Sequence, residues 1–376
     1  MSHVVIIGSG LAGCATVRTL RQQGCDASIT VISPEPSLFY YPGLLRSLAE
    51  MRVEDSVLIN LKRFFEDQDV DHFAANVTGL SPEAAVVKTD VTDVGYDYLV
   101  IASGSRYSPS IAGSEHVINP LKSWSEMMRY QRALNELEGG SLVIGFGAHQ
   151  EDPLAFQGGP VFDLLFAIDS RLRNQRQRRS YDITFASPSL KHELRFVDEP
   201  FDNLLSQFKR NHIHFLGEDI VSFDRDGLDT LNTRVPSNLT AFVPGLAGPE
   251  WSASSGLKVT GSGLFETNAA CQAVGHENIY VAGDAGRFSD RPMKLTQYYL
   301  ADLTGEIAAH NIAALARGKT PIAVLSSDEH GITESVDNNS LICRGKQRNY
   351  IRRGVPLTWS RNLMEWQTLR RYKNVS

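Results

Sequence analysis

The chain of 376 residues is 42% hydrophobic and 21% charged with a formal net charge of −6, the composition of a soluble globular protein of two or three domains. No run approaches the roughly 18 apolar residues of a membrane span, the start does not resemble a signal peptide, and the four cysteines lack CxxC or metal-ligand spacing. We therefore expect a cytoplasmic protein with no metal site, no disulfide framework and no nucleic-acid partner.

The first predicted element is a buried strand at residues 3–7, which leads into the loop Gly8-Ser9-Gly10-Leu11-Ala12-Gly13. A helix over 11–23 follows, and residues 27–32 form a second apolar strand at the distance that a βαβ unit requires. In such a loop the first glycine permits a tight turn, the second lets the backbone approach a pyrophosphate, and the third allows close helix packing. The six residues therefore predict a dinucleotide site at a helix N-terminus.

The end of the second strand departs from the usual pattern. An acidic residue normally accepts the ribose hydroxyls there, whereas this chain has Ser33, with Glu35 two residues later. Either Glu35 reaches the ribose or Ser33 bonds it more weakly. The alternative is that Glu35 is an exposed residue of a proline-flanked turn.

A second strand–glycine pattern begins at residue 141 but does not continue as a nicotinamide site would. After Gly145 and Gly147 the third glycine is absent, Glu151 and Asp152 lie at the phosphate position, and Pro153 interrupts the expected helix. The helix is expected instead to start near residues 159–160 and to run to 173. A second Rossmann-like domain without an ordinary NAD(P) site is therefore predicted.

Two further motifs complete a recognisable set. Residues 96–105 read YDYLVIASGS, with Ala102, Ser103 and Gly104 after a strand, and residues 278–285 read NIYVAGDA, with Gly283 and Asp284 after another strand. With the first glycine loop, they resemble the motifs of the pyridine nucleotide-disulfide oxidoreductase superfamily over about residues 1–320. The resemblance implies FAD as cofactor, with Asp284 on its ribityl chain.

One branch of that superfamily is most similar. Residues 37–45, SLFYYPGLL, resemble a stretch of type II NADH dehydrogenases and sulfide:quinone oxidoreductases, which implies that Pro42 lies near the isoalloxazine ring. The alternative is a hydrophobic loop with a proline turn.

Residues 292–312 resemble the final flavin-contacting helix of the same family. The resemblance implies that Lys294 lies near flavin N1 and O2, where a cation would stabilise the reduced ring, and that Gln297 faces the flavin or a quinone. The alternative for Lys294 is a surface lysine at a helix start.

The main departure from sulfide:quinone oxidoreductases is the absence of their redox cysteines. Residues 155–160 read AFQGGP, and residues 104–240 contain no cysteine. Thiolate chemistry is thereby in doubt. Cys343 could approach the flavin, or it could be a small buried residue.

The C-terminal residues 341–376 contain nine basic side chains and one acid, so this segment is +8 and the remainder −14. Trp359, Leu363 and Trp366 recur there at helical spacing. This pattern predicts either a membrane-surface helix or a stripe that packs on the body of the protein.

Together these features predict an α/β protein with two Rossmann-like domains. Residues 1–107 and 240–318 would form the FAD domain, 108–239 the inserted second domain, and 319–376 a C-terminal extension. The predicted activity is transfer of two electrons from a small-molecule donor through FAD to an acceptor, for which a quinone or a protein is considered. The alternatives are an NAD(P)H dehydrogenase with an altered nucleotide loop, and a flavoprotein that binds or modifies a partner protein. The location would be cytoplasmic or peripheral on the inner membrane face.

Overall fold

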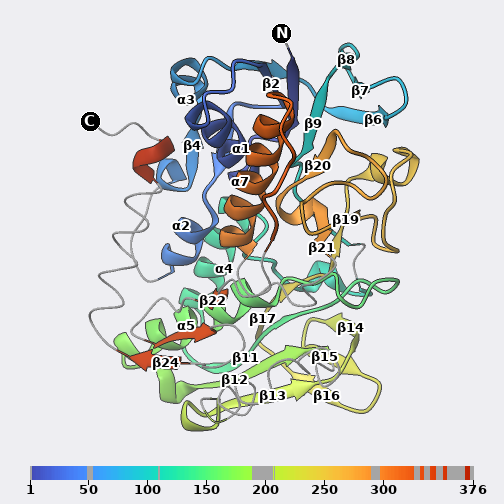
Figure 1. The fold of residues 1–376 in the computed structure, drawn as a ribbon. Helices are drawn as coiled ribbons and strands as arrows, with labels where there is room; N and C mark the ends of the chain where they lie inside the picture. The colour runs from blue at the N-terminus through green and yellow to red at the C-terminus, as the bar shows by residue number, and fades with distance from the viewer. Residues whose placement is uncertain are drawn as a thin grey trace.

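The structure is a computed structural model, which describes residues 2–48, 54–108, 111–188, 206, 208–288, 297–325, 331–333, 339–343, 350–353 and 369–372. It contains two α/β units, the first in the upper and the second in the lower half of Figure 1. The predicted α/β class with two Rossmann-like units is confirmed.

The first unit is built on a five-stranded parallel sheet. Its strands, in spatial order, are β20 (Ile279–Val281), β9 (Tyr98–Ile101), β1 (His3–Ile7), β2 (Ser28–Ser33) and β5 (Asp71–Ala74). Side chains of β1 alternate between two cores, as the period of a strand requires. Val4 and Ile6 pack with helices α1 (Leu11–Gln22) and α7 (Gln297–Leu315), whereas Val5 and Ile7 face the opposite layer.

That opposite layer is an antiparallel meander with a neighbouring irregular segment. The meander consists of β6 (Val77–Ser81), β7 (Val86–Thr89) and β8 (Val94–Gly95). Smaller pieces of the first unit are β3 (Ser37–Phe39) paired with β4 (Leu58–Asn60), α2 (Tyr41–Arg46), α3 (Lys62–Asp67), and β19 (Phe265–Thr267) paired with β21 (Gly286–Phe288). Short 3-10 turns lie at Glu54–Ser56, Ser114–His116, Arg178–Ser180, Glu250–Ser254 and Gly283–Ala285.

The second unit repeats this plan on a four-stranded parallel sheet. Its strands, in spatial order, are β13 (Ile213–Gly217), β12 (Tyr181–Ser187), β11 (Gly140–Phe146) and β17 (Leu239–Val243). Helices α4 (Trp124–Glu136) and α5 (Gly158–Asn174) share one core with it, and β14 (Ile220–Asp224), β15 (Gly227–Thr230) and β16 (Arg234–Pro236) cover the other face.

The chain returns to the first unit after β17, near the expected boundary at about residue 240. β17 pairs with β11 from Leu142↔Leu239 to Phe146↔Val243, so the chain leaves the second sheet only after Val243. The two connections between the units then run together, because β10 (Arg106–Tyr107) pairs antiparallel with β18 (Leu246–Ala247).

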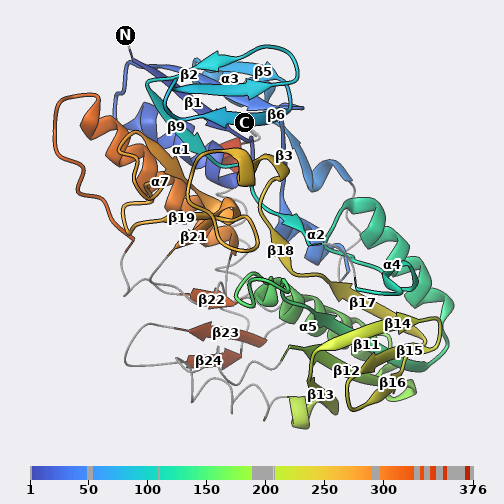
Figure 2. The ribbon, with the colours of Figure 1, turned by 90° about the vertical axis from the view of Figure 1, so that its right-hand side faces the viewer.

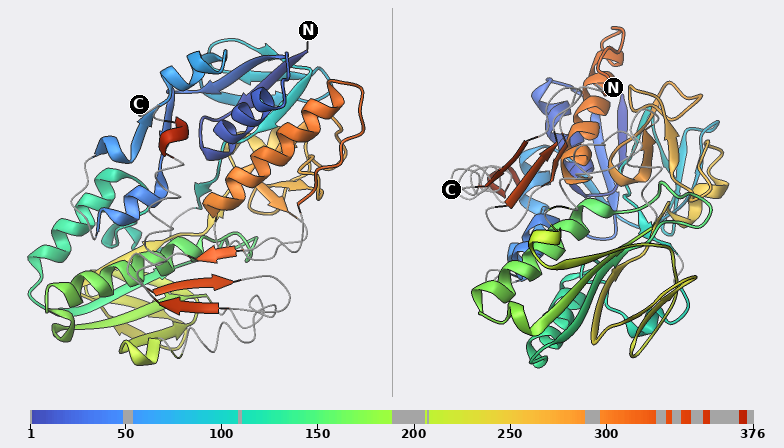
Figure 3. Two further views of the ribbon diagram at one scale, coloured as in Figure 1. Left: turned by 60° about the vertical axis from the view of Figure 1, so that its left-hand side comes forward. Right: turned by 90° about the horizontal axis from the view of Figure 1, so that it is seen from below.

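The C-terminal part begins with an antiparallel sheet of β22 (Gly331–Thr333), β23 (Asn339–Cys343) and β24 (Tyr350–Arg353). Figures 2 and 3 show this sheet beside the second unit, where β22 contacts α5. Residues 369–372 return to the first unit as a helical turn. Within the described ranges, no helix combines the length and apolar character needed to cross a bilayer.

Candidate functional site

A pocket of about 170 Å³ lies where the carboxyl ends of the first sheet meet the second unit. Three segments far apart in the sequence line it, namely the glycine loop after β1, the segment after β9 and the turn after β20. The second unit adds the start of α5. The lining residues are Gly10, Leu11, Ala12, Phe39, Tyr41, Ala102, Gly104, Gln157, Pro160, Ala282, Gly283, Asp284 and Ala301.

The three glycines of the first loop have different surroundings. A Cβ at Gly8, whose φ is +104°, would lie 2.4 Å from the Ala102 carbonyl oxygen, and a Cβ at Gly13 would lie 2.1 Å from the Gly8 carbonyl oxygen. A Cβ at Gly10 would meet nothing within 4 Å. The inner side of the loop is thus closed by backbone, while Gly10 leaves open space at the N-terminus of α1. This arrangement fits the close approach of a dinucleotide pyrophosphate.

The turn after β20 brings Asp284 to the same pocket. Gly283 has φ +67°, and its N–H donates to Thr304 Oγ1 of α7 at 2.9 Å. This bond fixes the turn against α7, and the half-buried Asp284 then lines the pocket. A carboxylate at this place fits the hydroxyl groups of a ribityl chain.

The end of β2 holds a serine–histidine pair in place of the usual acid. The buried Ser33 Oγ donates to the Glu35 carbonyl oxygen at 2.8 Å and lies 3.0 Å from His72 Nε2. His72 Nε2 also donates to the Ser33 carbonyl oxygen at 3.1 Å, and burial lowers the pKa of this imidazole. The side chain of Glu35 is exposed. The Ser33 hydroxyl thus contacts other protein groups, whereas the exposed Glu35 side chain remains available for the expected ribose contact.

The segment 39–42 contributes aromatic residues rather than its proline. Phe39 and Tyr41 line the pocket with their rings 6.1 Å apart, whereas Pro42 lies in the first turn of α2 and is not among the lining residues. Burial raises the pKa of Tyr41 well above its ordinary value, so its hydroxyl stays protonated. No role was predicted for Tyr41, whose only signal in the sequence was its place beside Pro42.

Gln157 and Pro160 are the contribution of the second unit, and neither was predicted. The Tyr107 hydroxyl lies 3.3 Å from Gln157 Oε1 and 3.3 Å from the Leu121 carbonyl oxygen. Tyr107 belongs to β10, one of the two paired connections between the units, so it links the start of α5 to these connections. The sequence signal was the delayed helix start, because α5 begins at Gly158, close to the predicted residues 159–160.

The loop after β11 is filled by its own backbone. The N–H of His149 donates to the Ala155 carbonyl oxygen at 3.3 Å, and the same oxygen accepts from the Leu246 N–H at 2.8 Å. A Cβ at Gly245 would lie 2.3 Å from His149 N, so the β17–β18 connection packs tightly on this loop. Residues 148–157 therefore separate the glycines from the helix that would otherwise receive a phosphate.

The side chain of Asp152 in this loop contacts residues of the first unit. Its carboxylate accepts from Ser262 Oγ at 2.6 Å and forms an ion pair with Arg287. Burial opposes ionisation, but the Ser262 hydrogen bond and the Arg287 charge together hold the pKa of Asp152 below its ordinary value. A fixed carboxylate at this place disfavours a nicotinamide nucleotide phosphate.

No thiol lines the pocket among the three cysteines whose side chains the structure describes. Cys14, Cys25 and Cys271 are buried, and burial raises the pKa of the Cys14 thiol, which therefore stays protonated. Their burial is that of packing residues.

Three predicted catalytic residues are only partly described. Lys294 lies outside the described residues. Gln297 is the first residue of α7, and Cys343 is the last residue of β23, opposite Gly331 of β22; only their backbones are described. β23 belongs to the sheet whose neighbouring strand β22 contacts α5 (Figure 3).

Residues 2–153 match the pyridine nucleotide-disulphide oxidoreductase family. Over 297 residues, 75% of this chain and 67% of the relative, the sequence is 26% identical to the sulfide-quinone reductase of Aquifex aeolicus. Residues 2–153 thus resemble this family, and the likeness to the A. aeolicus relative extends the resemblance over most of the chain. These likenesses support an FAD-dependent oxidoreductase.

One further relative and one solved structure are similar to most of the chain. The apoptosis-inducing factor homolog B of Dictyostelium discoideum is 20% identical over 328 residues, which is 85% of this chain and 82% of that protein. The X-ray structure of the sulfide:quinone oxidoreductase from Aquifex aeolicus superposes with a TM-score of 0.85 at 21% identity, covering 100% of this chain and 92% of that one. The latter likeness confirms the predicted fold.

Proposed function

We propose that this protein passes two electrons from a small-molecule donor through FAD to a quinone. One observation carries the proposal: a single pocket is lined by the glycine loop, by Gly283 and Asp284, and by the first turn of α5, while the loop that would receive NAD(P)H is closed by the Asp152–Arg287 pair. A cofactor site and a donor site can therefore share the first pocket, whereas the second loop offers no phosphate site.

The proposed roles of the first unit follow from its geometry. The loop Gly8-Ser9-Gly10-Leu11-Ala12-Gly13 would hold the pyrophosphate, Asp284 the ribityl hydroxyls, and Glu35 with Ser33 the ribose end. Ala102, Ser103 and Gly104 would border the cofactor along the sheet edge, and Pro42 would lie near the isoalloxazine ring. Bound FAD supplies the two-electron redox chemistry.

The second unit would define the donor side. Gln157 and Pro160 line the pocket from α5, and the protonated Tyr41 hydroxyl provides a hydrogen-bond donor beside them. Because none of the described cysteines lines this pocket, the donor would react without a protein thiolate from that part of the chain. Lys294 and Gln297 at the start of α7 and Cys343 on β23 remain proposed catalytic residues.

A quinone is proposed as acceptor because the A. aeolicus relative is named a sulfide-quinone reductase. Quinones are membrane-borne, and the +8 segment 341–376 would supply the contact with an anionic membrane surface. A redox protein is the other acceptor class, since a structure of similar fold is a putidaredoxin reductase–putidaredoxin complex.

Two measurements test this proposal in sequence. First, Asp284→Ala should leave the purified protein with less than about a tenth of its FAD, because the variant loses a charge-assisted bond in the pocket, whereas the exposed Asp93→Ala should retain wild-type FAD. Second, photoreduced wild-type protein is mixed anaerobically with a short-chain ubiquinone analogue. Rapid return of the oxidised flavin spectrum is expected, and a spectrum that stays reduced would reject the quinone.

A further inference from the structure

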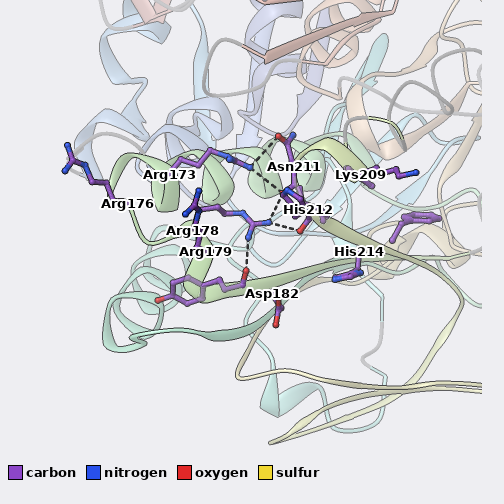
Figure 4. A pocket seen from close by; sticks show the side chains of 13 residues that line it. Arg173, Arg176, Arg178, Arg179, Asp182, Lys209, Asn211, His212 and His214 are labelled. Atoms are coloured by element: carbon purple, nitrogen blue, oxygen red, sulfur yellow. Dashed lines mark hydrogen bonds between the residues drawn. The ribbon is translucent and has the colours of Figure 1, made fainter.

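A second, larger pocket lies in the second unit, at the end of the sheet that faces away from the cofactor pocket. Its volume is about 1130 Å³, and it surrounds the amino ends of β12 and β13 and the carboxyl end of α5 (Figure 4). α5 has 17 residues, so about 25 Å of helix separates this pocket from the start of α5 at the cofactor pocket. Dinucleotide loops lie at the carboxyl ends of strands, so this pocket is distinct from both of them.

Two arginines form a fixed framework in this pocket. Arg173 Nε and Arg178 Nε bond the two carboxylate oxygens of the buried Asp169 at 2.7 and 2.5 Å. Arg178 also donates to the carbonyl oxygens of Tyr181 and His212 at 2.7 and 2.8 Å, contacts that Figure 4 shows at the centre of the pocket. Two guanidinium groups share one carboxylate, so the framework keeps a net positive charge.

Three further cations surround this framework and are exposed, namely Arg176, Arg179 and Lys209. Within the part of the chain that the structure describes, none of the three forms an ion pair. In Figure 4, Arg176 and Lys209 lie at opposite sides of the pocket. Among the described lining residues, Asp182 is the one carboxylate. The positive charge is therefore in excess, although the whole chain carries −6.

The floor of the pocket is apolar. Three of its lining residues are buried, namely Tyr181, Phe208 and Ile213. The half-buried Phe215 adds a partly accessible aromatic ring. Phe215 is fixed by Phe185 and Phe208, with ring centroids 6.5 and 6.1 Å away. A cationic rim over an apolar aromatic floor suits a ligand that has both phosphates and a planar ring.

We propose that this pocket binds a nucleoside polyphosphate. Guanidinium groups match phosphate oxygens bidentately, aromatic side chains stack on bases, and small-ligand sites occupy roughly 300–1,000 Å³, a size the pocket reaches. Because this site is separated from the cofactor pocket by the length of α5, binding there is independent of the proposed electron transfer.

The test uses FAD-loaded protein, so that the first dinucleotide loop is already filled, and isothermal titration with ATP at low ionic strength. We expect one ATP per chain, and we expect the double substitution Arg176→Ala, Arg179→Ala to weaken binding about tenfold or more, as the loss of two charge-assisted contacts requires. The matched control is Arg63→Ala, Arg132→Ala, which removes two exposed arginines elsewhere. Both variants should keep wild-type FAD content and melting temperature.

Two partial ligands separate phosphate recognition from ring recognition. Adenosine should not bind detectably, and tripolyphosphate should bind several-fold more weakly than ATP. The proposal is overturned if the FAD-loaded protein does not bind ATP, or if the control pair weakens binding as much as the pocket pair. Tripolyphosphate binding as tight as that of ATP would overturn the assignment to nucleotides.

Discussion

Gly10 and Gly13 lie in one loop, but the absence of a side chain is needed for a different reason at each position. Gly13 lies within α1 against the backbone of Gly8, so its missing side chain is needed for packing, whereas Gly10 faces open space and is needed only if a ligand approaches. The helix-propensity gain of Gly→Ala, about 1 kcal/mol, favours the substitution at position 13 but is smaller than the cost of a backbone clash at 2.1 Å.

Gly13→Ala should therefore lower the free energy of unfolding of the FAD-free protein by about 3 kcal/mol, the upper part of the range for overpacking. Gly10→Ala should leave that free energy within about 0.5 kcal/mol while weakening FAD affinity about tenfold or more, equivalent to about 1.4 kcal/mol. Denaturant unfolding and FAD titration measure the two quantities. Equal effects of both variants on apo stability would contradict the distinction.

Asp152 carries a pH-dependent prediction. Its pKa in the folded protein is below its usual value of 3.8, so its ionised form stabilises the fold. This contribution is complete at neutral pH and is lost as the pH falls through the lowered value. Asp152→Ala should cost about 3 kcal/mol at pH 7, because it leaves the mostly buried Arg287 side chain, 15% exposed, without its ion-pair partner.

The comparison is made by denaturant unfolding of wild type and variant between pH 7 and pH 3. The difference in the free energy of unfolding between wild type and variant should be constant near neutral pH and should shrink below about pH 4. The exposed Glu83→Ala should leave the free energy of unfolding unchanged over the whole pH range. A difference that grows as the pH falls would show that Asp152 is protonated in the folded state.

At the scale of elements, α1 and α7 pack closely because of another glycine. A Cβ at Gly305 of α7 would lie 2.4 Å from the Ala12 carbonyl oxygen of α1. Gly305→Ala should lower the free energy of unfolding by about 2–3 kcal/mol and lower FAD affinity, because α7 also fixes Gly283 through Thr304. His310→Ala, on the exposed face of the same helix, should have no effect on either quantity. Wild-type stability of the Gly305 variant would mean that the helices can separate at no cost.

Elements with a local signal were predictable from the sequence. The glycine loop, the strands at 3–7 and 98–101 and the delayed α5 carry their pattern within a few residues, and the structure contains each of them. Features that depend on distant partners were not. The pairing with β11 shows that β17 belongs to the second sheet up to Val243, and Asp152 forms its ion pair with Arg287, 135 positions away. Tyr41, Gln157 and Pro160 become neighbours only when the two units meet.

At the scale of the whole molecule, the C-terminal helical turn is fastened to the first unit. Tyr372 is 2% exposed, its hydroxyl accepts from Arg18 Nη1 at 3.0 Å, and its ring packs on Phe64 with centroids 5.4 Å apart. Arg18 is held in turn by Glu306 of α7 at 2.6 Å. At these residues the chain packs on its own body; Trp359, Leu363 and Trp366 lie outside the described residues.

Tyr372→Ala should lower the free energy of unfolding by about 3 kcal/mol, as for other buried aromatic residues, and Tyr372→Phe by about 1 kcal/mol for the lost hydrogen bond. Limited proteolysis should cut the C-terminal segment faster in the alanine variant than in the phenylalanine variant. Identical cleavage rates in both variants and in wild type would show that this contact does not hold the segment.

In the proposed function, electrons do not enter the flavin from a nicotinamide nucleotide. The most direct measurement is anaerobic stopped-flow mixing of the FAD-loaded protein with NADH, NADPH or sulfide, following flavin absorbance. The loop at 147–157 is filled by its own backbone, and Asp152 is paired with Arg287. We therefore expect no flavin bleaching by NADH or NADPH above the slow background. Bleaching should occur only with a small donor such as sulfide. Fast bleaching by NADH or NADPH would contradict the account and make this chain a nicotinamide-linked dehydrogenase.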